Sequence, residues 1–431
     1  MIGGEHFVLA GHIVYTPDKN TFSITENGYL VCEGGHVTGV FATLPERFSA
    51  LPLYRYTDCL IIPGLCDTHV HAPQYAFRGL GMDLELIDWL DRRAFPQELR
   101  YADLAYAERA YGQFVSALTQ SATTRAAVFG TIHVPATLRL MEMLEKTGLR
   151  CLVGKVNMDR NAPDGLRDPE PDEALEQTEK WVKQALSRFE RTRPILTPRF
   201  VPSCTDRLME GLGELQRAYG LPVQSHLSEN VSEVEWVREL CPWAESYGGA
   251  YARYGLFGGA APTVMAHCVH PTDAEFDLIR RQDVLVSHCP ASNANLSSGV
   301  APVGRYLDAG IRVGLGTDVA GGFDLSIFRA MTDAVQFSKL RAHFMGMRER
   351  PVTLCEAFYM GTKGGGTLFG KVGSFEPGYL FDAVVLNDHR LKAPGALSIQ
   401  ERLERAVYLE KDVVIEHKFV QGSEITGGVP E

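Results

Sequence analysis

The chain has 431 residues, of which 45% are hydrophobic and 22% are charged. This composition is ordinary for a globular protein with a large core, and the length fits one α/β barrel together with a smaller domain. The formal net charge of -11 argues against nucleic acid as a partner, because nucleic-acid binding usually needs a basic face. No apolar stretch approaches the roughly 18 residues that predict a membrane span, so no membrane partner is expected.

The nine cysteines are an odd number and include no CxxC pair. They do not predict a disulfide framework and instead indicate a reducing compartment. The first 15 residues have no basic start and no small-residue cleavage site, which argues against a secretory signal. We therefore expect a cytoplasmic protein.

Both ends of the chain are rich in short segments typical of β-strands. Residues 1–62 contain FVLAGHIVYT, GYLVCEGGHVTGVF and DCLIIPG, in which β-branched and aromatic residues alternate with turn formers. Residues 372–431 contain GYLFDAVVLND and AVYLEKDVVIEHKFVQG, which have the same character. We predict that these two segments together form one small β-sandwich domain.

Residues 63–371 alternate between short apolar runs and longer helix-like segments. The helix-like segments include PDEALEQTEKWVKQALSRFE and TDRLMEGLGELQRAYG, and the second is predicted to begin after Thr205 with Asp206 in its first turn. Eight strand–helix units predict a parallel (β/α)8 barrel, in which the active site lies at the C-terminal ends of the strands. The eight runs are LIIPGLCDTHVH, TTRAAVFGTIH, RCLVGKVNMD, PILTPRFVPS, LPVQSHLSEN, TVMAHCVH, DVLVSHCP and RVGLGTDV.

Histidine and aspartate side chains stand at the ends of several predicted strands. His69 and His71 end the first strand, and both would point into the barrel because alternate side chains share a face. His226 ends the fifth strand, His267 the sixth and Asp318 the eighth. Four imidazoles and one carboxylate would then meet near the barrel axis, which is a ligand set suited to Zn²⁺ and also to Fe²⁺.

Each of these histidines also has a simpler interpretation. A histidine at a strand end is more often a hydrogen-bonded core residue than a metal ligand, and an HxH pair alone is a weak motif. The metal site is predicted because each residue of the set ends a predicted strand. His288 ends the seventh run and could join the site or only line it, and His133, at the end of the second run, is a weaker candidate.

This pattern resembles the amidohydrolase superfamily, which has HxH on strand one, histidines on strands five and six, and aspartate on strand eight. The resemblance implies a distorted, metal-dependent (β/α)8 barrel with a small β-sandwich made from both chain ends. The segments DTHVHAPQYAFRG, TPRFVPSC, SHLSEN, HCPASNANLSSG and GLGTDVAGG are similar to the motifs of the guanine deaminase family. That similarity implies a homodimer with a zinc cofactor that hydrolyses guanine to xanthine and ammonia.

The resemblance also implies a metal count and a ligand set. Binuclear members carry a lysine at the end of strand four, where it is carbamylated to bridge two metals, and the segment ILTPRFVPS has no lysine. One zinc ion per chain is therefore expected. Its ligands would be His69, His71, His226 and Asp318, with His267 as a fifth ligand or a partner of the reacting water.

Three residues are expected to take part in the chemistry. Asp318 would act as the general base, although a ligand or structural carboxylate is the simpler role. Glu229 would carry protons to the ring nitrogen and to the departing ammonia, and its simpler role is to cap a helix in SHLSEN. His267 would assist them from the metal side.

The resemblance further assigns substrate contacts to three residues. Arg199 would donate two parallel hydrogen bonds to the acceptor edge of guanine, although an ordinary surface ion pair is its simpler role. The amide of Gln74 can both donate and accept along the ring edge, and Phe200 would stack on the base or wall the pocket. The other predicted substrate contacts are His71, His226, Glu229 and Asp318.

Two other functions fit the same sequence. A deaminase of another amino-heterocycle, such as a modified guanine, cytosine or an aminotriazine, would have the same metal shell, but HAPQY together with TPRF favours guanine. A non-catalytic scaffold relative would usually lack metal ligands, whereas this chain has all of them together with Glu229.

Overall fold

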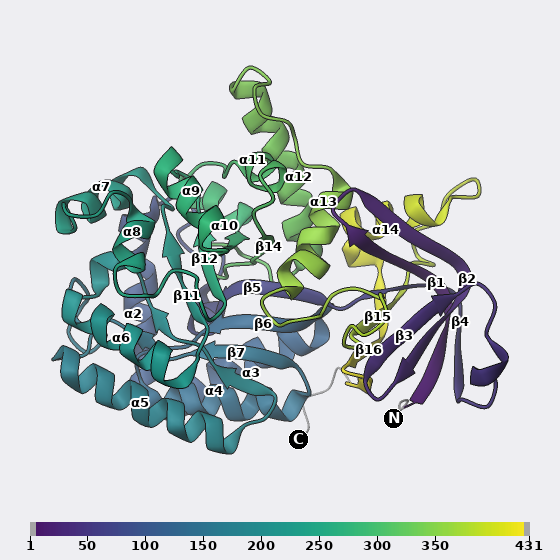
Figure 1. Ribbon diagram of the computed structural model, residues 1–431, viewed down its shortest axis with the longest axis horizontal. Helices are drawn as coiled ribbons and strands as arrows, with labels where there is room; N and C mark the ends of the chain where they lie inside the picture. The colour runs from purple at the N-terminus through teal and green to yellow at the C-terminus, as the bar shows by residue number, and fades with distance from the viewer. Residues whose placement is uncertain (1–5, 426–431) are drawn as a thin grey trace.

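The structure, a computed structural model, describes residues 6–425. It consists of a barrel with surrounding helices and, beside it, a sheet that joins the first strands of the chain to the last ones (Figure 1). The outermost residues of the predicted segments 1–62 and 372–431 lie outside the described residues. Residues 1–5, which belong to the N-terminal stretch that is expected not to be a secretory signal, also lie outside the described residues.

Eight successive parallel strand positions form the barrel within the described residues, and they are the eight runs predicted from the sequence. The strands pair in the orders β5-β6-β7-β9 and β11-β12-β13-β14, and β10 pairs with β8. A bridge between Leu196 and Val223 links the two halves on one side. On the other side, the backbone N–H of Asp318 donates to the carbonyl of His69 at 2.9 Å. The strands are β5 (Leu65–His71), β6 (Thr123–Phe129), β7 (Arg150–Gly154), β8 (Val156–Asn157), β9 (Thr192–Pro194), β10 (Thr197–Pro198), β11 (Val223–Leu227), β12 (Thr263–His267), β13 (Leu285–His288) and β14 (Val313–Leu315).

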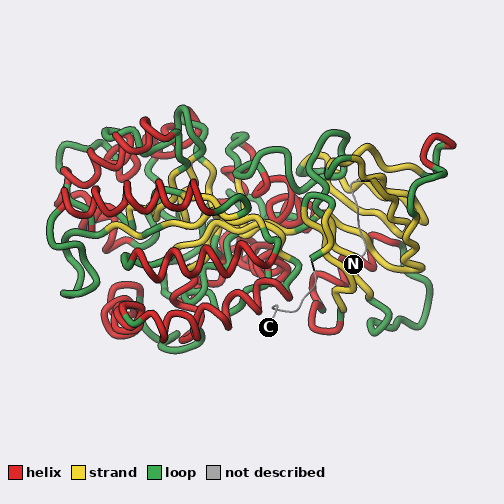
Figure 2. The backbone as a smooth tube through the Cα atoms, turned by 90° about the horizontal axis from the view of Figure 1, so that it is seen from below, coloured by secondary structure: helices red, strands yellow, loops and turns green. Residues whose placement is uncertain are grey.

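Helices surround these strands, as the two views show (Figures 1 and 2). Every residue of β5 and β6 is buried, which fits parallel strands that are covered on both faces. No helix among residues 6–425 is both long and apolar enough to cross a membrane. The helices of this part are α1 (Leu86–Trp89), α2 (Phe95–Glu98), α3 (Leu104–Gln120), α4 (Val134–Thr147), α5 (Pro171–Arg188), α6 (Asp206–Tyr219), α7 (Val231–Leu240), α8 (Tyr247–Ala252), α9 (Asp273–Arg281), α10 (Pro290–Asn295), α11 (Val303–Asp308), α12 (Ile327–Phe344) and α13 (Leu354–Tyr359). Short 3-10 helices are η2 (Ala72–Phe77), η4 (Leu99–Ala102) and η5 (Val201–Ser203), and short π-helices are η3 (Leu90–Ala94) and η6 (Met360–Gly364).

Local sequence accounts for the two long helices that were predicted. Helix α5 covers most of the segment that begins PDEAL. Helix α6 starts as expected, because the Thr205 hydroxyl accepts a hydrogen bond from the backbone N–H of Leu208 and Asp206 lies in the first turn. It ends at Gly220, whose φ of 62° suits glycine at a helix C-terminus.

The second part is a mixed sheet with the strand order β17-β16-β15-β4-β1-β2-β3. Strands from both chain ends meet within it, since β15 pairs antiparallel with β4, and β4 pairs parallel with β1. The predicted combination of both ends in one small β domain is therefore confirmed, while its exact boundaries stay a prediction. The elements are β1 (His6–Asp18), β2 (Thr21–Glu33), β3 (His36–Phe41), η1 (Glu46–Phe48), β4 (Leu53–Pro63), β15 (Ala383–Asn387), α14 (Ile399–Tyr408), η7 (Glu410–Asp412), β16 (Val414–Val420) and β17 (Ser423–Glu424).

One predicted strand near the C-terminus is partly wrong. The segment AVYLEKD belongs to the end of α14 and to η7, and only the part from Val414 onward is a strand. The helix forms because Ser398 and Glu401 make a capping box, in which each side chain accepts a hydrogen bond from the other residue's backbone N–H. Its buried residues, including Leu403 and Val407, then face the core on one side of the helix.

Two buried basic side chains connect the sheet to the barrel. The guanidinium of Arg125 on β6 donates from Nε to Asp382 Oδ2 at 2.6 Å and from Nη2 to Oδ1 at 3.2 Å. The Lys418 side chain on β16 donates from Nζ to the carbonyl oxygen of Thr119, in the last turn of α3, and to those of Ser121 and Thr123, just after it. These contacts hold the two parts together.

All nine cysteines are free, as expected without a disulfide framework.

We expect Asp382→Asn to lower the free energy of unfolding by about 3–5 kcal/mol, because Arg125 would stay buried without its counter-charge. Urea unfolding followed by circular dichroism measures this difference. Asp283→Asn is the matched control, because it breaks the exposed pair between Asp283 and Arg312, 2.7 Å apart. The control should change the free energy by less than about 1 kcal/mol, and equal losses in both variants would contradict the assigned role.

Candidate active site

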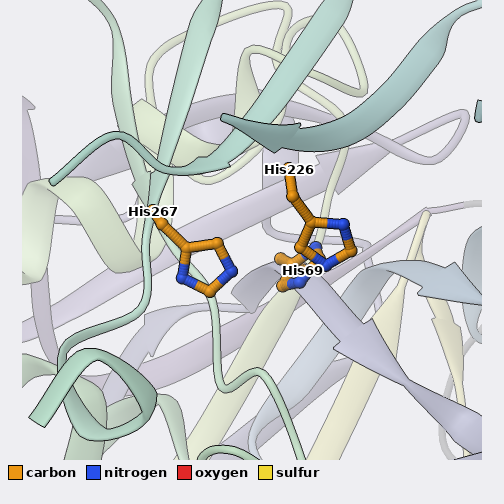
Figure 3. A group of neighbouring side chains, drawn as sticks. All are labelled: His69, His226 and His267. Carbon is orange, nitrogen blue, oxygen red and sulfur yellow. The ribbon is translucent and has the colours of Figure 1, made fainter. Parts of the chain in front are cut away.

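A group of buried histidines and one aspartate gathers at the C-terminal ends of the barrel strands. His69 Nε2 and His71 Nε2 lie 3.2 Å and 3.4 Å from Asp318 Oδ1. His71 Nε2 lies 3.2 Å from His226 Nε2. The imidazoles of His69, His226 and His267 converge from three different strands (Figure 3). The structure therefore brings together the five residues that the sequence predicts as metal ligands.

The chemistry of this donor set fits a divalent metal. Nε2 of His69 and Nε2 of His267 are buried without a hydrogen bond of good geometry, which is costly unless a further partner is bound. Burial, followed by the nearby His69 imidazole, lowers the pKa of His71 and of His226 well below the usual range. These imidazoles are therefore neutral, which is the form that binds metals. Two groups have donor atoms within 4.8 Å of one another: His69, His226 and His267, and His69, His71 and Asp318.

A third group brings Cys289 close to His267 and Asp318. Sequence reasoning did not predict this thiol. Burial, reinforced by the charge of Asp318, raises the pKa of the Cys289 thiol well above its usual range. Because the thiolate is the form that binds metals, the protonated thiol is a weaker donor than the neighbouring imidazoles.

Asp67, the carboxylate just before the two histidines, joins the first and last barrel strands. It accepts hydrogen bonds from the Thr317 hydroxyl at 2.5 Å, from the Thr317 backbone N–H at 3.1 Å and from the His69 backbone N–H at 3.2 Å. Asp318 follows directly with a φ of 46°, a backbone conformation that a tight connection must enforce. Asp67 thereby holds the His69 and Asp318 side chains opposite each other.

Two polar contacts orient the remaining imidazoles. His226 Nδ1 lies 2.6 Å from the carbonyl oxygen of Arg199, and His267 Nδ1 lies 2.8 Å from Asn293 Oδ1. With Nδ1 engaged, Nε2 of each ring is directed at the centre of the cluster. Asn293 was missed by sequence reasoning, although its position on α10 in HCPASN was a usable signal.

Glu229 lies on the open side of this cluster. Its Oε2 is 3.3 Å from His267 Nε2, and the side chain is buried. Burial, reinforced by the charges of Glu233 and Asp318, raises the pKa of Glu229 well above its usual range, so it can hold a proton near neutral pH. The simpler capping role does not belong to Glu229, because Asn230 and Glu233 form the capping box of α7.

A cavity opens onto the cluster. All eight residues predicted to contact the substrate or take part in catalysis line it, whereas His69 does not. Apolar side chains that the sequence did not single out form part of its wall, including Trp89, Leu86 and Leu296. The lining residues are His71, Gln74, Leu86, Trp89, Leu90, Arg199, Phe200, His226, Glu229, Glu233, His267, Leu296, Asp318 and Gly321.

Arg199 is not the surface ion pair of the simpler interpretation. Only 3% of its surface is exposed, and its guanidinium donates to both carboxylate oxygens of Glu98, at 2.5 Å and 3.0 Å. The same Glu98 accepts from Gln74 Nε2 at 2.8 Å. Glu98 was missed because nothing in the sequence around FPQE distinguishes a buried carboxylate from an exposed one.

The two remaining histidines stay outside the site. His288 is buried at the end of β13, but it belongs neither to the cavity lining nor to a metal-type group, and burial lowers its pKa to about 3. His133 lies at the start of α4 and lines a different cavity with Tyr101 and Asp168.

The sequence profile of the amidohydrolase family matches residues 60–425. This chain belongs to that family. A guanine deaminase from Dictyostelium discoideum is 38% identical over 374 residues, which are 85% of this chain and 82% of that protein. A guanine deaminase from Escherichia coli K12 is 33% identical over 98% of both chains.

Solved structures agree with this assignment to the amidohydrolases. The crystal structure of a guanine deaminase from C. acetobutylicum, with guanine bound in its active site, is 43% identical with a TM-score of 0.95. The match covers 98% of this chain and 100% of that one. An adenosine deaminase from Xanthomonas campestris with bound zinc is 20% identical with a TM-score of 0.80, which shows the shared fold. The predicted amidohydrolase barrel is confirmed.

We expect elemental analysis of the purified chain to find about one divalent metal ion per chain. His69→Ala should lose most of this metal, because His69 belongs to two of the donor groups. His133→Ala is the control and should keep the metal, because His133 lies in another cavity. Two metal ions per chain, or full metal content in His69→Ala, would contradict the predicted mononuclear site.

Proposed function

We propose that this amidohydrolase is a guanine deaminase, which hydrolyses guanine to xanthine and ammonia. One observation carries the proposal: the chain superimposes over nearly its whole length on a guanine deaminase that holds guanine. The cavity supports it, because it joins the cluster of metal-type donors to the polar side chains of Gln74 and Arg199.

We further propose zinc as the metal, with Fe²⁺ as the alternative. Neutral imidazoles and one carboxylate are the donors that zinc prefers at a catalytic site. Such an ion lowers the pKa of a water molecule and supplies hydroxide near neutral pH. The ion would be held by His69, His71, His226 and Asp318, with His267 beside them.

Two carboxyl groups of the chain would then move the protons. Asp318 faces the cavity beside His69 and His71 and is placed to accept a proton from the attacking water. Glu229 faces the same space and can give a proton to the ring nitrogen and then to the leaving amino group. A carbon–oxygen bond forms at the carbon that bears the amino group, the carbon–nitrogen bond breaks, and ammonia leaves.

Arg199, Gln74 and Phe200 would bind and orient the base. Two guanidinium nitrogens of Arg199 face Glu98, and the N–H groups that this pair does not use are available to the acceptor edge of guanine. Phe200 forms a side of the cavity on which a flat ring can pack. Adenine would place an amino donor where guanine has its oxygen acceptor, opposite the arginine donors.

Another amino-heterocycle, such as a modified guanine, cytosine or an aminotriazine, stays the alternative substrate, because the donors for the metal would be the same. A scaffold role is disfavoured by the complete donor set and by the buried Glu229.

We also propose a homodimer in the cytoplasm. The end of α12 projects from the barrel (Figure 1), and the exposed side chains there include Leu340, Phe344 and Met347. An exposed apolar group of this kind is typical of a contact surface.

Purified, zinc-loaded protein should release ammonia from guanine far faster than from adenine, because adenine opposes the arginine donors with a donor of its own. Ammonia release from guanine, adenine, cytosine and related amino-heterocycles measures this preference. Faster deamination of adenine or cytosine than of guanine would refute guanine as the substrate and leave the metal-dependent deaminase class standing.

Glu229→Gln keeps the shape of the side chain and removes the group that titrates. We expect kcat to fall by about 10²–10⁴-fold, the usual contribution of general acid–base catalysis. Metal content should stay near that of the unmodified protein. Glu235→Gln, an exposed position on the same helix α7, is the matched control and should leave kcat unchanged. A near-normal rate in Glu229→Gln would mean that the proton is carried by another group.

A further inference from the structure

Glu98 is a buried carboxylate that lies behind the substrate cavity. Its side chain is 2% exposed and does not line the cavity, whereas its partners Arg199 and Gln74 both do. One oxygen, Oε2, accepts from Arg199 Nη1, and the other, Oε1, accepts from both Arg199 Nη2 and Gln74 Nε2. A single carboxylate therefore engages both polar side chains that are proposed to bind the base.

This contact sets the orientation of the Gln74 amide. Nε2 must point at Glu98, because a carboxylate only accepts hydrogen bonds. Oε1 on the other side accepts from the Ala320 backbone N–H at 3.0 Å. Nε2 and Oε1 of Gln74 thus each have one hydrogen-bond partner. A flip of the amide would place two acceptors together at Glu98 and two donors together at Ala320. The amide can present only one arrangement of donor and acceptor to a ligand.

The same carboxylate fixes the Arg199 fork and balances its charge. The two hydrogen bonds form the planar bidentate pairing that arginine makes with carboxylates. Phe95 lies on the same short helix α2 as Glu98, and its ring centre is 5.2 Å from the Arg199 guanidinium. Helix α2 therefore contacts Arg199 both through a carboxylate and through an aromatic ring. Because the positive charge is neutralised, the donors of Arg199 face the cavity without favouring an anion.

We propose that Glu98 is a positioning residue that makes the site specific for a neutral purine. This inference rests on the proposed guanine deaminase function. It holds the Gln74 amide and the Arg199 fork in one arrangement, and it removes the attraction that an uncompensated guanidinium would exert on an anionic ligand. Guanine is neutral near pH 7, whereas the product xanthine is a weak acid that becomes an anion as the pH rises. Glu98 therefore favours substrate over ionised product.

The decisive variant is Glu98→Gln in the zinc-loaded protein, which keeps size and removes the charge. We expect kcat/KM for guanine to fall by about 10-fold or more, mostly through a higher KM, because the binding groups lose their arrangement. Inhibition by xanthine should become stronger, and more so at pH 8.5 than at pH 6, as the anion meets an unbalanced guanidinium. A purely structural loss would lower kcat with the amount of folded enzyme and leave KM and xanthine inhibition unchanged.

Arg199→Ala separates a direct from an indirect role of Glu98. Arg199→Ala alone should lower kcat/KM for guanine by about 10²-fold, since a desolvated polar edge goes unpaired. Because part of the effect of Glu98 passes through Arg199 and the rest through Gln74, adding Glu98→Gln to this variant should lower kcat/KM by a smaller factor than Glu98→Gln does in the unmodified protein. Fully additive losses would overturn the positioning role.

Glu108→Gln is the matched control, because it breaks an exposed glutamate–arginine pair with Arg139, 2.9 Å apart. It should leave KM and xanthine inhibition unchanged. If the unmodified protein releases no ammonia from guanine, the proposed function fails. If it does, but Glu98→Gln behaves like Glu108→Gln, the inference about Glu98 fails while the function stands.

Discussion

Closure of the barrel between its last and first strands is the constraint on which the site depends. The backbone N–H of Asp318 donates to the His69 carbonyl, the N–H of His71 donates to the Val319 carbonyl, and Asp67 ties Thr317 to the same strand. Residues about 250 positions apart in the sequence are thereby held in one small space. Without this closure the HxH pair would have no carboxylate opposite it, and the buried Nε2 atoms would have no metal to share.

The cavity has two halves of different origin. Strand ends supply the metal-type donors, whose positions follow from the pairing of parallel strands. The connection after β5 supplies Gln74 and Trp89 to the other half, and it also carries Glu98, which meets Arg199 from the end of β10. The strand ends thus supply the metal-type donors, and the longer connection after β5 shapes the cavity for a particular ring.

Two buried arginines in this molecule are each balanced by a carboxylate. Arg199 pairs with Glu98 beside the cavity, and Arg125 pairs with Asp382 where the sheet meets the barrel. Such pairs contribute less net stability than their distances suggest, because both charges lose their hydration, but removing one partner is costly. Their effect is to define one arrangement of the surrounding side chains.

The eight strand–helix units, the donors at their ends and the union of both chain ends in one sheet could be predicted from the sequence. These features depend on local patterns: apolar runs, polar residues at strand ends, and turn formers between strands. The C-terminal helix α14 was missed because a strand-like composition in AVYLEKD outweighed the capping signal at Ser398 and Glu401.

Which polar residues are buried partners follows from the tertiary structure and not from the local sequence. Nothing in the sequence around Glu98 marks it as different from a surface carboxylate, and although Cys289 and Asn293 lie in the HCPASN segment, only the fold places them beside His267. It also decided that His288 and His133 stay outside the site, although both end predicted strands. The physical reason is that burial, charge pairing and side-chain direction depend on which strands become neighbours, and this is a property of the closed barrel rather than of any local segment.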